Sequence, residues 1–368
     1  MIFDVAVIGG GPAGSAAALS FRKIVPEAKI AIFDAGRLQR WKPGETLAPG
    51  ATEILESLGC LPSFQHAIEH NEALESFGTK AAWGADVPYE REFLFSLHGN
   101  GWRLDRARFD VMLLERAEAR GIDVFRNTAL KDSLEEESGW RLRFAGGEHR
   151  ARFVIDATGR AARFAAQRGV RPIVSDNLAG VFVLFKSATE GDTLIEAAES
   201  GWWYSTTVPG STAVAAWMSD TDLIRQMTLR DSEQWNALLA QSTHTRIRLC
   251  GAESECAPGI FAAHSQRLSE FGGPRWVAAG DAAMTFDPLS SQGILKALRS
   301  GKLASFVAAD FLLRGADTLE RYARLAAAEY AAYEQAKRDF YREEMRWPSA
   351  PFWARRQAEP PVNPSATS

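Results

Sequence analysis

The sequence predicts an α/β fold in which a βαβ domain carries an inserted antiparallel sheet and is followed by a helical C-terminal extension. Three observations indicate this architecture. A glycine-rich turn joins a strand to a helix at the N-terminus, a strand with a Gly-Asp turn and a helix follow about 270 residues later, and apolar residues alternate in two stretches between them. With 368 residues, 46% of them hydrophobic, the chain is long enough to bury the cores of two domains.

The N-terminal segment FDVAVIGGGPAGSAAALSF has the pattern of a buried strand, a glycine turn and an alanine-rich helix. Gly9 permits the tight turn, Gly11 lets the backbone approach a pyrophosphate, and Gly14 lets the helix pack closely on the strand. A second strand, KIAIF, ends twenty residues beyond Gly14 in Asp34, where a carboxylate can accept hydrogen bonds from a ribose. A GxGxxG turn alone is weak evidence for nucleotide binding, but the strand, the helix and the acid together predict an adenine dinucleotide. They do not distinguish NAD from FAD.

The far end of the chain separates these two cofactors. In RWVAAGDAAMTFDPLSSQGILKALRSG, an apolar strand leads into Gly280 and Asp281, and a helix begins near Gly293. A dehydrogenase with a single βαβ nucleotide unit has no need of such a segment. FAD is longer, and its ribityl chain and isoalloxazine ring need their own contacts. The segment therefore favours FAD.

These two segments resemble the superfamily of FAD-dependent aromatic hydroxylases, tryptophan halogenases and geranylgeranyl reductases, which has a glutathione-reductase-like fold. The resemblance implies that Asp281 binds the ribityl hydroxyls and that the helix after Gly293 directs its N-terminus at the flavin pyrimidine edge. The expected cofactor-binding residues are Gly9, Gly11, Pro12, Ala13, Gly14, Asp34, Gly44, Glu45, Thr46, Arg106, Gly280, Asp281, Ser291, Gln292, Gly293 and Ile294.

Three further segments match the superfamily. WKPGETLAPG matches its GE segment, which would lie beside the flavin, although such a turn could also simply precede a helix. GWRLDRARFDVMLLERAEARG predicts a helix capped by Asp105 and stopped at Gly121. Arg106 would reach the cofactor phosphates from this helix, or be an exposed first-turn arginine. RARFVIDATGR ends in a small-residue turn, Ala157 to Gly159, where the backbone would pass close to FAD.

The segments between the cofactor motifs predict a second, substrate-binding domain. The segments VFVLFKS, DTLIEAAESGWWYSTTVPG and TAVAAWMSD predict an antiparallel sheet with one wall toward the flavin. Trp202, Trp203 and Pro288 are candidates to line the substrate pocket, and the alternative for the tryptophans is ordinary sheet core. A helix is expected from Gly315 to about Met345. The predicted division is an FAD-binding domain from 1–73, 101–169 and 263–315, a substrate domain from 74–100 and 170–262, and a C-terminal helix and tail from 316–368.

Composition limits the partners. A net charge of −4 without a basic stripe argues against nucleic acid. No apolar run approaches the length of a membrane span, and the first motif begins too near the N-terminus for a cleavable signal. Cys60, Cys250 and Cys256 form no metal or disulfide motif, so buried thiols and no metal site are expected. The sequence thus predicts a cytoplasmic protein that binds neither nucleic acid nor membrane.

The resemblance also suggests the reaction. It implies a monooxygenase that uses O2 through a flavin C4a-hydroperoxide and takes electrons from NAD(P)H or a separate flavin reductase, since no second GxGxxG turn is present. Aligning Pro209 with the halogenase WxWxIP marker places Tyr204 and Thr206 at its tryptophans, so the marker is absent. Lys80 falls near the position of the halogenase lysine, or is a surface lysine at a strand start.

The nearest likeness is to flavoproteins that hydroxylate a tryptophan of a partner protein during cysteine tryptophylquinone maturation. It is carried by ESFGTKAAWG, HGNGWRLDRARFD, ESGWWYS, FDPLSSQG and REEMRWPSAPFWARR. The implied function is hydroxylation of an aromatic side chain, foremost tryptophan, in a peptide or protein. The alternatives are a flavin-dependent halogenase, a small-molecule aromatic hydroxylase, and a non-enzymatic FAD-bound chaperone or binding module.

Overall fold

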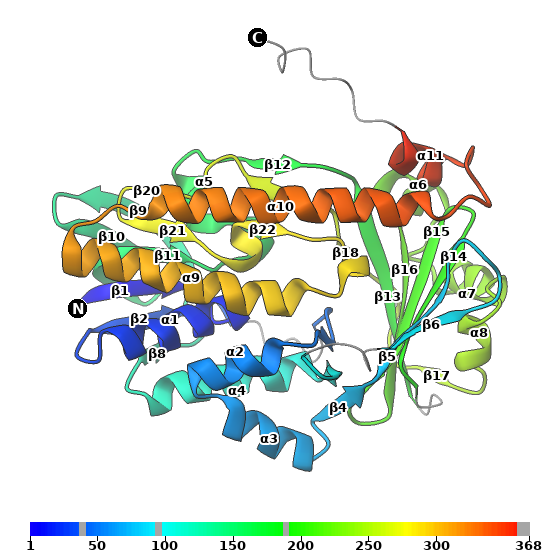
Figure 1. The fold of residues 1–368 in the computed structure, drawn as a ribbon, viewed down its shortest axis with the longest axis horizontal. Helices are drawn as coiled ribbons and strands as arrows, with labels where there is room; N and C mark the ends of the chain where they lie inside the picture. The colour runs from blue at the N-terminus through cyan, green and yellow to red at the C-terminus, as the bar shows by residue number, and fades with distance from the viewer. Residues whose placement is uncertain (37–41, 93–97, 187–190, 359–368) are drawn as a thin grey trace, which may run out of the picture.

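The computed structural model describes residues 1–36, 42–92, 98–186 and 191–358. Two large sheets form its two ends, and a long C-terminal helix runs along the molecule from the first sheet to the second (Figure 1). This arrangement confirms the predicted α/β fold with an inserted, mainly antiparallel sheet and a helical C-terminal region.

The first sheet has a parallel centre. Strand β1 pairs in parallel with both β2 and β11, and β11 pairs in parallel with β21. The short, almost wholly buried run of β1 explains its central position, since parallel strands are covered on both faces. The strands of this sheet are β1 (Ile2–Ile8), β2 (Ile30–Phe33), β8 (Asp123–Phe125), β9 (Leu130–Glu136), β10 (Gly139–Phe144), β11 (Gly147–Asp156), β20 (Gly272–Gly273) and β21 (Trp276–Ala278).

Two helices from opposite ends of the chain, α1 (Pro12–Ile24) and α9 (Gly293–Arg314), pack against each other. Their backbones approach closely at Gly301, where an added Cβ would lie 2.1 Å from the Ala13 carbonyl oxygen. Helix α4 (Arg106–Ala119) begins as predicted, because the Asp105 carboxylate accepts hydrogen bonds from the backbone N–H groups of the first turn. The shorter helices here are α2 (Ala51–Leu58), α3 (Leu61–Glu69) and α5 (Arg163–Gln167).

The second sheet follows the predicted strands and is antiparallel except where β14 pairs in parallel with β5. One face packs on the helices α6 (Thr221–Gln226), α7 (Ser232–Ala240) and α8 (Thr245–Arg248), and part of the other packs on the C-terminal segment. Its strands are β5 (Gly78–Ala82), β6 (Tyr89–Glu92), β13 (Leu178–Lys186), β14 (Thr193–Ala198), β15 (Gly201–Val208), β16 (Thr212–Asp220), β17 (Glu253–Ser254) and β18 (Gly259–Ala262).

Two three-stranded sheets join these parts. One contains β3 (Thr46–Leu47), β7 (Gly101–Leu104) and β4 (Ala73–Ser76). The other contains β12 (Pro172–Val174), β19 (Gln266–Leu268) and β22 (Met284–Thr285).

The C-terminal segment is part of the core. Helix α10 (Leu319–Arg342) ends three residues before the predicted Met345, and α11 (Pro351–Gln357) follows it. Phe352 and Trp353 are fully buried against the second sheet. Residues 359–368, the end of the predicted tail, lie outside the described residues.

The predicted burial of the cysteines holds for one of the three. Cys60 is buried, whereas Cys250 and Cys256 are exposed, so the prediction that all three thiols are buried is wrong. All three cysteines are free. Among the described residues, no helix is long and apolar enough to span a bilayer.

Candidate cofactor and substrate site

A cavity of about 340 Å³ lies between the carboxyl ends of β1, β11 and β21 and one face of the second sheet. This edge of a parallel sheet is where α/β proteins bind their ligands. The cavity brings together most of the predicted cofactor residues, which come from four separate parts of the chain. Those that line it are Gly11, Pro12, Ala13, Gly44, Glu45, Thr46, Arg106, Asp281, Ser291, Gln292, Gly293 and Ile294. Pro288, predicted for the substrate pocket, lines the same cavity.

The predicted glycines lie where the backbone of two segments comes close together or where the backbone faces the cavity. Gly9 has φ +111°, and an added Cβ would lie 2.2 Å from the Ala157 carbonyl oxygen, so the two loops touch beneath the cavity. An added Cβ on Gly14 would lie 1.9 Å from the Gly9 carbonyl oxygen. Gly280 has φ +63° and lies against Ala13. Gly11 faces open space within the described chain, which is the cradle that a cofactor phosphate would occupy.

Asp34 lies at the end of β2 rather than in the cavity lining. Its Oδ1 accepts a hydrogen bond of 3.2 Å from the backbone N–H of Gly10, in the glycine turn. The carboxylate is thus held beside the turn that would bind the pyrophosphate, and its ribose-binding role stays a prediction.

Asp281 pairs with a residue that the sequence motifs do not identify. Lys296 Nζ lies 2.7 Å from Asp281 Oδ1 and also donates to the Met284 carbonyl oxygen, and the lysine side chain is only 1% exposed. Withdrawal from water would raise the pKa of Asp281, but the charges of Lys296 and Arg160 lower it below its ordinary value. Asp281 therefore faces the cavity as an anion, able to accept hydrogen bonds from hydroxyl groups.

Glu45 is buried at the other side of the cavity. Tyr204 donates a hydrogen bond of 3.3 Å to its Oε2, while its Oε1 has no hydrogen-bond partner within the described chain. Burial raises the pKa of Glu45 to about 7, despite the nearby charge of Arg106. An orphaned buried carboxyl oxygen is costly, so a polar ligand atom at this position would satisfy it.

Two arginines supply positive charge to the cavity. Arg106 donates to the Gly44 carbonyl oxygen at 3.0 Å and lies 3.2 Å from Asp110, so it faces the cavity rather than solvent. Arg160, which directly follows the predicted Ala-Thr-Gly turn but was not predicted as a site residue, donates to the His264 carbonyl oxygen at 2.7 Å. Guanidinium groups at this edge suit the negative phosphates of a dinucleotide.

The substrate-facing wall differs from the prediction. Trp202 and Trp203 are both fully buried and are absent from the residues that line the cavity in the described chain. Trp203 points to the opposite face of the sheet, where its ring centre lies 5.1 Å from that of Trp217 and 5.3 Å from that of Trp235. The strands of the second sheet and the residue after them instead give the cavity Phe182, Tyr204, Met218, Phe261, Ala262 and Ala263.

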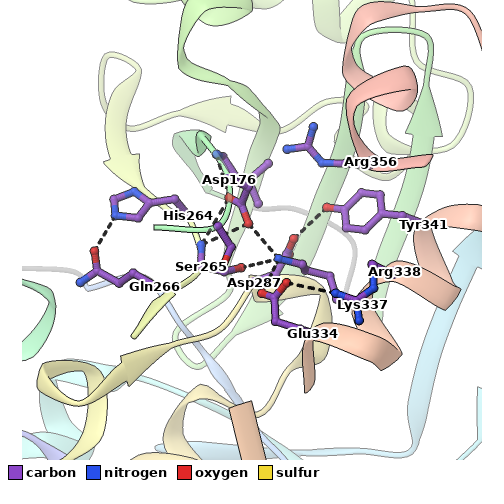
Figure 2. A network of polar contacts seen from close by, with 12 residues as sticks. Asp176, His264, Ser265, Gln266, Asp287, Glu334, Lys337, Arg338, Tyr341 and Arg356 are labelled. Carbon is purple, nitrogen blue, oxygen red and sulfur yellow. Dashed lines mark hydrogen bonds and ion pairs between the residues drawn. The ribbon is translucent and has the colours of Figure 1, made fainter. Parts of the chain in front are cut away.

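Trp202 lies beneath the C-terminal helix. Its indole Nε1 donates to Tyr341 Oη at 3.1 Å, and Tyr341 Oη donates to Asp287 Oδ2 at 2.8 Å. Asp287, immediately before the predicted Pro288, lines the cavity and is 2% exposed. Figure 2 shows Asp287 between Tyr341 and a polar cluster around Lys337. Burial, followed by the charge of Asp176, raises the pKa of Asp287 to about 6.

Lys80 is the other pocket candidate that the structure places elsewhere. Its side chain is 49% exposed, its Nζ lies 2.6 Å from Glu90 Oε1, and it is absent from the described cavity lining. His66, Glu69 and His70, at the end of α3, are not in the described cavity lining and form an exposed group whose potential ligand atoms lie within 4.8 Å of one another. No metal motif in the sequence indicated that group.

The residues present fit FAD. The turn at Gly11 and the two arginines would hold the phosphates, Asp281 would hold the ribityl chain, and the segment from Gly44 to Thr46 would contact the ring system. Beside this region, the wall from the second sheet is apolar and aromatic. The cavity can therefore hold a redox cofactor next to a flat, uncharged substrate.

Comparisons with known proteins agree with this description. The sequence profile of the FAD binding domain family matches residues 3–324. The putative FAD-dependent oxidoreductase LodB of Marinomonas mediterranea is 31% identical over 368 residues, which cover 97% of each chain.

Solved structures share the fold. The myxobacterial chondrochloren halogenase CndH has a TM-score of 0.86 at 22% identity and covers 98% of this chain and 87% of its own. The peptidyl tryptophan dihydroxylase QhpG, essential for tryptophylquinone cofactor biogenesis, has a TM-score of 0.73 at 21% identity and covers 98% of this chain and 80% of its own.

Proposed function

Because this chain belongs to the FAD binding domain family and is a flavin-dependent enzyme, we propose that it is a monooxygenase that hydroxylates an aromatic side chain, foremost tryptophan, of a peptide or protein. The observation that carries the proposal is the composition of the cavity. Its wall from the second sheet contains Phe182, Tyr204, Met218 and Phe261, with no charged side chain among the described residues of that wall. A neutral ring suits this surface.

The residues around the ring position have defined tasks. FAD supplies the oxygen-activating redox chemistry when bound. The apolar wall excludes water and orients the ring, while the Glu45–Tyr204 pair offers a group able to hold or release a proton near neutral pH. Electrons come from NAD(P)H or a separate flavin reductase, and O2 is the co-substrate.

A protein or peptide substrate is supported by likeness to QhpG, a peptidyl tryptophan dihydroxylase essential for tryptophylquinone cofactor biogenesis. The described cavity wall also lacks a basic residue that would hold the carboxylate of a free aromatic acid on the second-sheet side. We infer a role in the maturation of a partner protein.

Halogenation is the second candidate, and CndH supports it by fold. Against it stand the missing WxWxIP marker and the position of Lys80, which is half-exposed and paired with Glu90 outside the cavity lining. A small-molecule hydroxylase would use the same wall, and an FAD-bound chaperone or binding module would show no turnover.

The test uses the FAD-loaded, reduced full-length enzyme with O2. The expected result is oxygen uptake coupled to a hydroxylated tryptophan peptide, with no halogenated product when chloride or bromide is present. Coupled hydroxylation of free tryptophan or a simple phenol in preference to peptides would favour the small-molecule alternative. Oxygen uptake without any product, or none at all, would contradict the proposal.

A further inference from the structure

Two tyrosines of α10 form hydrogen bonds to the same residue of the cavity lining, Asp287. Tyr333 Oη accepts a hydrogen bond of 2.6 Å from the backbone N–H of Asp287, and Tyr341 Oη donates one of 2.8 Å to Asp287 Oδ2. The two tyrosines are eight residues apart, about two helical turns, so they lie on the same side of α10. The C-terminal helix therefore holds both the backbone and the side chain of Asp287.

Asp287 in turn shapes the segment that leads into α9. Its Oδ1 accepts a hydrogen bond of 2.9 Å from Leu289 N–H and caps the 3₁₀ turn Pro288–Ser290. That turn is followed by Gln292 and Gly293, which line the cavity and begin α9. The Asp287 carboxyl group therefore connects the C-terminal helix to the cavity, because one of its oxygens binds the turn and the other binds Tyr341 of α10.

We propose that Tyr341 is a positioning residue of the cofactor site: by donating to Asp287, it fixes the orientation and stabilises the charged form of the carboxyl through which the C-terminal helix acts on bound FAD. The proposal depends on FAD binding alone and is independent of whether the enzyme hydroxylates or halogenates. Nothing in the sequence motifs indicated a role for α10 at the cofactor.

The surroundings of Asp287 make its charge sensitive to this hydrogen bond. Burial is the main cause that raises the pKa of Asp287, and the charge of Asp176 adds to it. The hydrogen bond from Tyr341 and the charge of Lys337 act in the opposite direction. Lys337 Nζ lies 3.0 Å from Asp176 Oδ2, and Figure 2 shows this cluster beside Asp287. Asp176 before β13 and the side chains of Tyr333, Lys337 and Tyr341 of α10 act on this carboxyl directly. Behind them, Glu334 of α10 lies 2.8 Å from Lys337 Nζ, and the Arg356 guanidinium of α11 lies 5.2 Å from the centre of the Tyr341 ring.

The sign of the effect follows from the charge of FAD. FAD is an anion, so it binds better when Asp287 is neutral, and its affinity falls as the pH rises through the pKa of Asp287, about 6. Loss of the Tyr341 hydroxyl removes a donor that favours the carboxylate, which raises that pKa. In Tyr341→Phe, the pH at which the affinity for FAD falls is therefore higher than in the wild type.

The experiment measures the FAD dissociation constant of the full-length apoprotein by flavin fluorescence between pH 5 and 8, in the wild type and three variants. Tyr341→Phe removes the hydroxyl that donates to Asp287, and Asp287→Asn removes the charge. Tyr322→Phe is the matched control, because Tyr322 is a buried tyrosine of the same helix whose hydroxyl donates to the Ala278 carbonyl oxygen at 2.7 Å. Glu45, which also titrates near neutrality, is common to all four chains and cancels in the comparison.

The wild type and Tyr322→Phe should share a profile in which the dissociation constant rises about tenfold around pH 6, equivalent to a change of about one unit in the Asp287 pKa on FAD binding. Tyr341→Phe should move that rise upward by about one pH unit. Asp287→Asn should lose the rise near pH 6 and keep only the change around pH 7 that Glu45 contributes in every chain. Profiles of Tyr341→Phe and Tyr322→Phe that coincide, or a rise near pH 6 retained in Asp287→Asn, would overturn the proposal. If Tyr341→Phe does not fold, the Asp287→Asn profile alone decides.

Discussion

Lys296 Nζ lies 2.7 Å from Asp281 Oδ1, and the lysine is almost completely buried while the aspartate side chain is 42% exposed toward the cavity. The lysine reaches this position from the first turn of α9, with its ammonium 4.9 Å from the centre of the Phe286 ring. The expected cofactor ligand is therefore half of an ion pair whose other half has no access to water. Removing the aspartate affects both the ligand and the fold.

We expect Asp281→Ala to weaken FAD binding about 10-fold to 150-fold, because a hydrogen bond to a charged group contributes about 1.5–3 kcal/mol. The same change leaves Lys296 buried without its partner and should lower the unfolding free energy of the apoprotein. The double variant Asp281→Ala, Lys296→Met should recover stability in urea unfolding but not FAD affinity. Unchanged FAD affinity in Asp281→Ala would contradict the role of this carboxylate.

Gly301→Ala tests the contact between α1 and α9. The new methyl group would lie 2.1 Å from the Ala13 carbonyl oxygen, which belongs to backbone and cannot rotate away. We expect a loss of about 1–3 kcal/mol in the free energy of unfolding. Gly293→Ala is the control, since a Cβ there meets no described atom within 4 Å, and urea titration should find its apoprotein at least as stable as the wild type. Equal stability of the two variants would show that the helices can separate at little cost.

Glu45→Gln should change how stability depends on pH. The folded chain keeps the Glu45 proton up to about pH 7, whereas the unfolded chain releases it near pH 4.5, so folding is favoured by this group at low pH. Its contribution, about 3 kcal/mol, is complete below pH 4.5 and lost as the pH rises through 7.

Urea unfolding of the apoprotein at pH 5 and pH 8 measures this effect. The amide introduced by Glu45→Gln cannot ionise, so the variant should be more stable than the wild type at pH 8 and similar to it at pH 5. Tyr204→Phe should steepen the wild-type dependence, because Tyr204 stabilises the charged form of Glu45. Parallel pH profiles of the wild type and Glu45→Gln would show that Glu45 is ionised throughout.

Lys80→Ala should leave FAD affinity and oxygen uptake unchanged. Lys80 pairs with Glu90 on the surface, and an exposed pair contributes at most about 1 kcal/mol to stability. Reduced enzyme with bromide, O2 and a tryptophan peptide should give no brominated product in either chain. A brominated product from the wild type that Lys80→Ala abolishes would make the enzyme a halogenase.

Most of the residues predicted for the cofactor half of the site gather at one cavity, and the sequence indicates them because the constraints on them are local. Gly9, Gly14 and Gly280 occupy positions where a Cβ would meet backbone or a neighbouring helix, and such requirements appear directly as glycine in a motif. Asp105 and Gly121 mark the ends of α4 for a similar reason.

The substrate half depends on contacts between distant segments. Strand periodicity places Trp202 and Trp203 on opposite faces, but it does not say which face α7 covers or where α10 crosses the sheet. The structure buries Trp203 under α7 and Trp202 under Tyr341. Tyr204, two residues from Trp202 on the same face, reaches the cavity instead. Lys296 and Asp287 were missed because their partners lie in other elements.

The most direct test of the proposed function is the mass of a tryptophan-containing substrate after turnover under ¹⁸O₂. The FAD-loaded full-length enzyme, with a reductant, is incubated with a partner quinoprotein precursor or a peptide from it, and with free tryptophan in parallel. We expect ¹⁸O to enter the tryptophan side chain of the precursor at a much higher rate than free tryptophan. Oxygen consumption with no label in any peptide, or label in free tryptophan at an equal or higher rate, would contradict a protein-directed hydroxylase.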